Sequence, residues 1–135
     1  MIKSAQLGKE IVVTVVNKIG VLADVSKLLT DHGINIRAVN GYAIEKNAVL
    51  RLVTEDNLRA SDALKKAGYN NLAEKDAIIV ELENKPGALK ILTLKLAQEA
   101  IDIKYVYGSA CSAGCPASII LSTSDNEKAL VALKK

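Results

Sequence analysis

Hydrophobic and polar positions along the chain predict the same series of elements twice. The β-branched runs at residues 10–17 (EIVVTVVN) and 77–84 (AIIVELEN) each predict a strand. After each strand, apolar residues recur at helical spacing, from Val21 in the first case and from Ala88 in the second. A hairpin and then a helix with a polar N-cap are expected next in both halves.

The two halves are copies of one sequence. Residues 17–36 and 84–103 are identical at seven of twenty aligned positions. The alignment continues to Gly41 and Gly108 without a gap, and the second copy then gains two residues before the match resumes. Such in-register similarity indicates an internal duplication.

Each copy lacks one strand of a complete ferredoxin-like unit, in which the order is βαββαβ. We therefore predict an α+β fold of two such units in tandem, at residues 1–75 and 76–135, with antiparallel sheets and helices on one face. The first unit finds its last strand before residue 76, whereas the second is left without one. Residues 1–8 are expected to close the sheet of the second unit, so that the halves exchange their closing strands. The alternative is an unstructured N-terminal tail.

The two copies differ at the end of their first helix. Gly33 is expected to close the helix in the first copy, because glycine readily adopts the left-handed conformation needed there. Its counterpart is Ala100, for which that conformation costs about 1–2 kcal/mol, so the second helix is expected to end differently. His32 lies beside this helix end, where a cation favours the helix dipole, and we favour that structural role over metal binding.

Composition narrows the range of functions. The 135 residues are 50% hydrophobic but only 3% aromatic, so the core is expected to be aliphatic. A net charge of +3 with scattered lysines provides no basic stripe for a nucleic acid. No apolar run reaches the roughly 18–20 residues of a membrane span, and the N-terminus lacks the apolar segment of a signal peptide. We expect a cytoplasmic protein that binds neither nucleic acid nor membrane.

Residues able to carry catalysis form no familiar pattern. The sequence has no Gly-rich phosphate loop and no Ser/His/Asp or Cys/His constellation, so we predict that the chain is not an enzyme and needs no cofactor. Cys111 and Cys115 are weak metal candidates, because two thiolates are only half of a zinc site. The pair could also form a disulfide. The favoured interpretation is a small-residue hairpin turn with two incidental thiols, and a redox-sensitive loop is the alternative.

The strand-to-helix turn of each copy resembles the ACT domain family. Both copies have Asn-x-x-Gly-(Val/Ala)-Leu after a strand, and the helix then ends in Gly-Ile-Asn-Ile or Ala-Ile-Asp-Ile. The resemblance implies small ferredoxin-like modules that typically sense amino acids, with a ligand site where two ACT units meet and the turn gripping the ligand. The serine-sensing version has a histidine two residues before the turn asparagine. Here Val15 and Leu82 stand in its place, which favours an apolar ligand side chain over serine.

Elementary chemistry independently supports a site at this turn. A glycine before a helix lets a ligand approach the backbone, and the unsatisfied N–H groups of a helix N-terminus suit a carboxylate. Asn35 and Asp102 begin the next strand and are expected near the turn if the helix packs back on the sheet. Alternatively, the turn residues serve only to form tight turns. The candidate ligand-binding residues are Asn17, Gly20, Val21, Leu22, Asn35, Asn84, Gly87, Ala88, Leu89 and Asp102.

The function that follows is regulatory. We expect an amino-acid-binding module that modulates a separate metabolic enzyme and forms a homodimer. One alternative is a ligand-free subunit that serves only to assemble an enzyme complex. The other is a thiol or metal sensor built on the CSAGC loop at residues 111–115.

Overall fold

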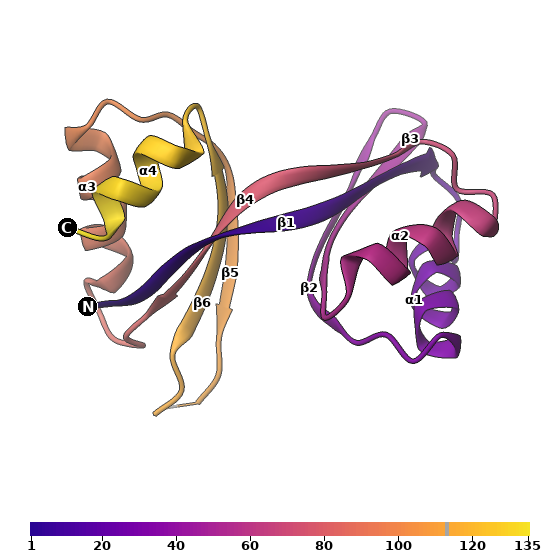
Figure 1. The fold of residues 1–135 in the computed structure, drawn as a ribbon, viewed down its shortest axis with the longest axis horizontal. Coiled ribbons are helices and arrows are strands. Elements are labelled where there is room, and N and C mark those ends of the chain that lie inside the picture. Colours follow the sequence, from indigo (N-terminus) through magenta and orange to yellow (C-terminus); the bar gives the residue numbers. More distant parts are fainter. Residues whose placement is uncertain (113) are drawn as a thin grey trace. The chain divides into compact units, whose positions relative to one another are not determined.

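The computed structural model describes residues 1–112 and 114–135 and has an α+β fold with antiparallel strands (Figure 1). The strands are β1 (Ile2–Val16), β2 (Ile36–Ile44), β3 (Asn47–Thr54), β4 (Leu72–Leu82), β5 (Ile103–Ala110) and β6 (Ala117–Thr123). The helices are α1 (Val21–Asp31), α2 (Asn57–Lys66), α3 (Ala88–Gln98) and α4 (Asn126–Leu133). The strands and helices predicted from periodicity are confirmed. The first strand is longer than expected, because residues 2–8 continue directly into it.

The contacts divide the chain into two compact units. Residues 9–75 form one, called here the first unit, and residues 76–135 together with residues 1–8 form the other, the second unit. The strand order is β2-β3-β1-β4 in the first unit and β1-β4-β6-β5 in the second. The long strands β1 and β4 therefore each contribute residues to both units.

In the first unit, helices α1 and α2 lie on the same side of the strands (Figure 1). The strand register explains this, because alternate residues of a strand point to one face. Ile11 pairs with Leu52 and Val13 with Leu50, and all four are buried against apolar residues of α1 and α2. The core is aliphatic, as the composition predicted.

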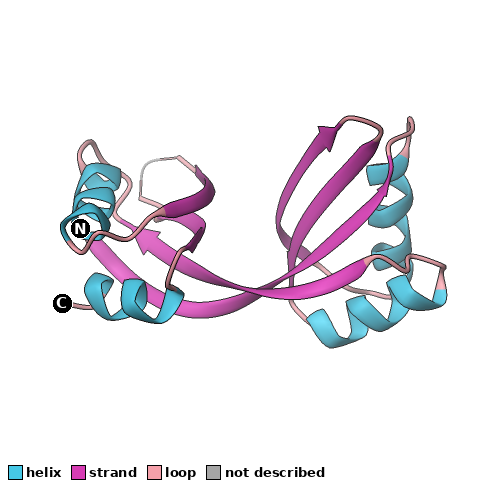
Figure 2. Ribbon diagram, turned by 90° about the horizontal axis from the view of Figure 1, so that it is seen from above, coloured by secondary structure: helices cyan, strands magenta, loops and turns pink. Residues whose placement is uncertain are grey.

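The second unit is built in the same way, with α3 and α4 on one side of its strands (Figure 2). Its core contains Ile78, Val80 and Leu121 from the strands, and Ala5 joins it from the N-terminal segment. The backbone N–H of Glu83 donates to the carbonyl of Met1 at 2.8 Å. Residues 2–8 are strand, so the alternative of an unstructured tail is wrong.

The second and fourth helices begin with the same set of hydrogen bonds. Asp56 caps α2 and Asp125 caps α4, each accepting from the backbone N–H three residues later. Just before each cap, a threonine donates through both its backbone N–H and its hydroxyl to the side chain of an asparagine. The amides of Asn57 and Asn126 then donate to the carbonyls of Lys9 and Asp76. These bonds give a physical reason for the repeat of Thr-x-Asp-Asn at residues 54–57 and 123–126.

The expectation that the helix before Ala100 ends differently is wrong. Ala100 has φ 55°, close to φ 69° at Gly33, and both helices close alike. The next residues, Ile34 and Ile101, are buried and donate their N–H groups to Leu29 and Leu96. Burial of the isoleucine and closure of the helix end offset the left-handed backbone of alanine.

Ala100→Gly is therefore expected to stabilise the protein by up to about 1 kcal/mol, because it removes the Cβ penalty of the left-handed conformation. The reverse change, Gly33→Ala, has open space around the new Cβ and is expected to cost about 1–2 kcal/mol through the backbone alone. Urea unfolding of both variants measures the two effects. Changes of the same sign would contradict this account.

Candidate ligand site

The strand-to-helix turn of the first unit is tightly defined. β1 ends at Val16, and the backbone N–H of Asn17 then donates to the carbonyl of Lys46 at 2.7 Å. Gly20 has φ 93° and ψ 0°, a left-handed conformation, and α1 begins at the next residue. Gly87 has nearly the same angles, φ 91° and ψ −12°, before α3. Glycine is thus required at both positions for the backbone itself, and the glycines were correctly predicted to lie at the helix starts.

The N-termini of α1 and α3 differ from those of the other two helices. Asp56 and Asp125 cap α2 and α4, whereas within the described residues no side chain caps α1 or α3. The first N–H groups of a helix have no partner within it, and its N-terminus carries a positive partial charge. Both helix starts can therefore accept an anionic group.

A cavity of about 330 Å³ lies against this turn in the first unit. It brings together four of the predicted residues, Asn17, Gly20, Val21 and Leu22. Residues of β2 and β3 complete the wall of the cavity, and the sequence did not predict them. The full lining is Asn17, Lys18, Gly20, Val21, Leu22, Gly41, Tyr42, Ala43, Ala48 and Leu50. The match of Gly41 with Gly108 in the repeat was the signal that could have identified the strand wall.

The lining of this cavity combines three kinds of group. Val21, Leu22 and Leu50 supply apolar surface, and Leu22 is still 44% exposed. Asn17 offers an amide, and Lys18 adds a positive charge beside the N-terminus of α1. Such a wall suits a small molecule that has a carboxylate at one end and an apolar side chain at the other.

The expectation that Asn35 lies near the turn is wrong. Ile36, the next residue, pairs with Thr54 on β3, whereas the turn follows Val16, which pairs with Asn47. Thr54 and Asn47 are seven residues apart on β3, which is about 23 Å at the rise of a strand. The backbone of Asn35 instead exchanges hydrogen bonds with Glu55. The helix does pack on the sheet, but its length carries Asn35 to the opposite end.

The same correction applies to Asp102 in the second unit. Its backbone N–H donates to the hydroxyl of Ser124, and its carbonyl accepts from the N–H of Ser124. Ile103 pairs with Thr123 at one end of β6, whereas the turn follows Leu82, which pairs with Ala117 at the other. Neither Asn35 nor Asp102 can share a site with the turn of its own unit.

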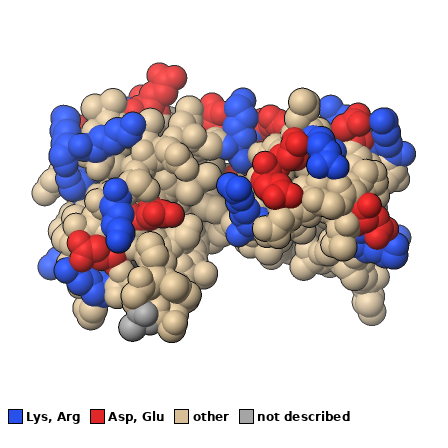
Figure 3. Space-filling view, turned by 60° about the horizontal axis from the view of Figure 1, so that its bottom comes forward, with Lys and Arg blue, Asp and Glu red and all other residues tan. Residues whose placement is uncertain are grey.

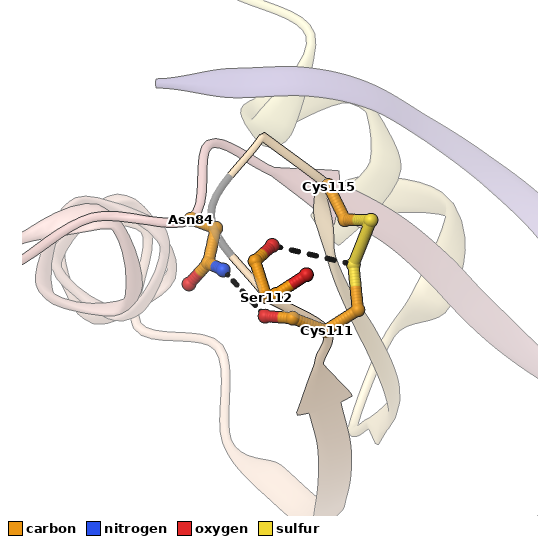
Figure 4. Close-up of a disulfide and its surroundings, with 4 residues drawn as sticks. All are labelled: Asn84, Cys111, Ser112 and Cys115. Carbon is orange, nitrogen blue, oxygen red and sulfur yellow. Dashed lines mark hydrogen bonds between the residues drawn. A yellow bond between two sulfur atoms is a disulfide. The ribbon is translucent and has the colours of Figure 1, made fainter.

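The turn of the second unit is engaged by the protein's own groups. The side-chain amide of Asn84 donates to the carbonyl of Cys111 at 3.0 Å (Figure 4). The Met1 side chain lies 3.9 Å from the place of a Cβ on Gly87. Ala88 is buried, and Leu89 is 51% exposed. The turn of the first unit, with a cavity against it, is the better candidate.

Charges also surround the turn of the second unit. Lys85 Nζ lies 2.7 Å from Glu83, and the N-terminal ammonium lies 3.3 Å from the same carboxylate. The hydrogen bond from Lys85, with a smaller contribution from the N-terminus, lowers the pKa of the Glu83 carboxyl below its usual value. Glu83 therefore stays ionised over the physiological pH range.

The two cysteines are joined by a disulfide, with Cα atoms 5.7 Å apart (Figure 4). The interpretation of two incidental thiols is therefore wrong, and bonded sulfurs are not the thiolates that bind a metal. Ala113, within the same segment, lies outside the described residues.

His32 lies at the end of the first helix, as the sequence predicts, and its Nδ1 is 2.8 Å from the carbonyl of Leu28. Among the described residues, no three His, Cys, Asp or Glu side chains are grouped as a metal site would require.

Two larger cavities are lined by neither Gly20 nor Gly87. One of about 530 Å³ in the second unit lies between the start of β1, α3 and the end of α4, and its lining includes Lys3, Lys95, Lys134 and Lys135. The other, about 410 Å³ in the first unit, lies between the end of β1 and residues 67–70, and it shares Lys18 and Val21 with the candidate cavity. Of the three cavities, the one of about 330 Å³ is lined by Asn17, Gly20 and Leu22 of the strand-to-helix turn. We therefore place the candidate site at the smaller cavity.

The surface charges are mixed. Lys and Arg side chains are interspersed with Asp and Glu over the face shown in Figure 3. A nucleic acid needs a continuous positive surface, which that face does not offer. Within the part of the chain that is described, no helix has both the length and the hydropathy to cross a membrane.

One family model matches part of this chain, and solved structures share its fold. The ACT domain model matches residues 9–68, close to the limits of the first unit. A crystal structure of a protein from Bacteroides thetaiotaomicron is similar over 96% of this chain and 88% of that one, with 27% identity and a TM-score of 0.88. The ligand-free regulatory subunit of aspartate kinase from Thermus thermophilus matches over 98% and 96%, with 14% identity and a TM-score of 0.67.

A structure of aspartokinase alpha and beta subunits is similar over 98% of this chain and 96% of that one, with 15% identity and a TM-score of 0.65. At 14% and 15% identity, the likeness to the aspartate kinase structures is one of fold alone. The comparison with curated proteins found no match. Residues 9–68 therefore match the ACT domain, and the fold of nearly the whole chain is shared with solved structures that include a regulatory subunit of aspartate kinase.

Proposed function

We propose that this protein is a regulatory module that binds an amino acid in the cavity beside Gly20 and thereby modulates a separate metabolic enzyme. The observation that carries the proposal is the cavity itself, which joins an uncapped helix N-terminus to an apolar strand wall. The N-terminus of α1 and Lys18 would hold the carboxylate, and Val21, Leu22 and Leu50 would surround an apolar side chain.

The ACT match over residues 9–68 supports the same function, because that family typically senses amino acids. The second unit is proposed as a second ACT unit, on the repeat in sequence and on the equivalent helix caps. Residues 1–8 would then close its sheet, and the two units would exchange strands. No catalytic step is assigned to the chain, so a partner enzyme or a homodimer would read out ligand binding.

A calorimetric panel of the twenty amino acids tests the proposal, since the chain has no Trp to report unfolding. An amino acid present at about 100 times its Kd is expected to stabilise the native state by about 2.7 kcal/mol and raise the Tm by several degrees. An amino acid with an apolar side chain is expected to raise the Tm more than the other amino acids do. If none of the twenty amino acids raises the Tm, ligand binding is contradicted, and a subunit that only assembles an enzyme complex is favoured.

Two glycine variants locate the site. Gly20→Val is expected to abolish the Tm shift, because the new side chain stands where the ligand meets the backbone. Gly87→Val is the matched control: its φ of 91° is nearly that of Gly20, so both changes carry the same backbone penalty. Loss of the shift in Gly87→Val alone would move the site to the second unit.

A further inference from the structure

The hairpin connection of the second unit contains a disulfide that the first unit lacks. In the first unit, β2 ends at Ile44 and β3 begins at Asn47, so the connection is a short turn. In the second unit, β5 ends at Ala110 and β6 begins at Ala117. Both cysteines of the chain lie in this longer connection, joined to one another.

This disulfide is coupled to the strand-to-helix turn through Asn84. The side-chain amide of Asn84 donates to the carbonyl of Cys111, one of the two bonded residues (Figure 4). In the first unit, the turn is tied to its hairpin by a backbone bond instead, from the N–H of Asn17 to the carbonyl of Lys46. A cross-link that restrains Cys111 therefore also restrains the acceptor that positions Asn84. Asn84 precedes Gly87 and the start of α3 by a few residues.

Both sulfurs belong to residues that a reductant can reach. Cys111, Ser112, Cys115 and Pro116 are all exposed. Exposed disulfides are the ones that exchange readily with dithiols, whereas structural bridges resist reduction.

We propose that the Cys111–Cys115 disulfide is a reversible redox switch that holds the turn at residues 84–87 when oxidised and releases it when reduced. A dithiol reductant supplies two electrons and two protons: its thiolate attacks one sulfur and the S–S bond breaks. The second thiol of the reductant then resolves the mixed disulfide. The products are two protein thiols and the oxidised, disulfide form of the reductant.

The switch acts on one half of the protein only. The first unit contains no cysteine, so its turn at residues 17–20 keeps the same backbone restraint in both redox states. The inference goes beyond the proposed ligand binding and does not depend on it, because it concerns the order of the turn in the protein without ligand.

Hydrogen–deuterium exchange of the oxidised and reduced full chain tests the switch. Reduction with dithiothreitol is expected to speed exchange of peptides that cover residues 84–90 by about fivefold to tenfold, the effect of losing about one hydrogen bond. Peptides that cover residues 17–23 are expected to remain unchanged. The double variant Cys111→Ser/Cys115→Ser is expected to behave as the reduced protein and to ignore dithiothreitol.

Asn84→Ala separates the coupling from a general loosening of the hairpin. In the oxidised state, this variant is expected to exchange at residues 84–90 as fast as the reduced wild type, and to respond no further to reduction. Asn17→Ala is the matched control in the other unit and is expected to leave residues 84–90 unchanged.

Three results would overturn the proposal. The first is an intact mass that shows two free thiols even after treatment with oxidised dithiothreitol. The second is a disulfide that resists millimolar dithiothreitol in the native protein, which would make it a static cross-link. The third is equal exchange at residues 84–90 in the two redox states.

Discussion

Deletion of residues 1–8 is expected to lower the free energy of unfolding by about 3–5 kcal/mol, although the deleted segment lies far in sequence from the unit it serves. The deletion removes Ala5 from the core of the second unit and Ile2 from its edge. Full burial of an isoleucine contributes about 1.5–3 kcal/mol, of which the partly buried Ile2 supplies a share, and each strand hydrogen bond adds about 0.5–1.5 kcal/mol. The bond from Glu83 to Met1 is among those lost.

Urea unfolding measures the size of this effect, and hydrogen exchange shows where it acts. Faster exchange is expected first in α3 and α4, which pack on the same core as Ala5. The control is the triple variant Lys3→Ala/Ser4→Ala/Gln6→Ala, which keeps the segment and changes only exposed side chains. It is expected to lower the free energy of unfolding by less than about 1 kcal/mol. If the deletion lowers the free energy of unfolding no more than the control does, residues 1–8 do not support the core of the second unit, and the proposed exchange of closing strands is wrong.

Gly41→Leu is expected to weaken amino acid binding at least about tenfold, a loss of about 1.4 kcal/mol. Gly41 lines the candidate cavity from β2, opposite Leu50. A Cβ at this position would lie 3.1 Å from the Leu50 side chain, whose flexible end can move by a few tenths of an ångström. The rest of the leucine would occupy the space proposed for the ligand. Gly41 does not have the left-handed backbone of Gly20, so its replacement tests the cavity with little strain.

Asn40→Leu is the matched control for this variant. Neighbouring residues of a strand point to opposite faces of the sheet. A leucine at residue 40, which pairs with Arg51, therefore adds similar bulk on the face opposite to that of Gly41 and Leu50. Isothermal titration calorimetry with the amino acid found in the panel compares the two variants. Equal affinities in Gly41→Leu and Asn40→Leu would show that the ligand binds elsewhere.

The sequence alone was enough to predict the local elements and the special turns. Periodicities of two and of three to four residues identify strands and helices, because each element must turn one apolar face to a core. Glycine before Val21 and before Ala88 indicated a backbone that other residues avoid, and both glycines have φ above 90°. The repeat made these signals stronger, since each occurs twice in register. The ACT resemblance was correct for residues 9–68.

Only the tertiary structure decided which of these local features meet. The sequence suggested that Asn35 lies near the turn, but the strand register places it at the far end of the first unit. The register also brought Gly41 and Leu50 to the cavity, although neither is near the turn in sequence. The sequence left a bond between Cys111 and Cys115 open but favoured two free thiols, whereas the structure joins them in a disulfide. The reason is physical: local propensity depends on neighbours along the chain, whereas a site depends on which strands pair and in which register, and long-range burial sets both.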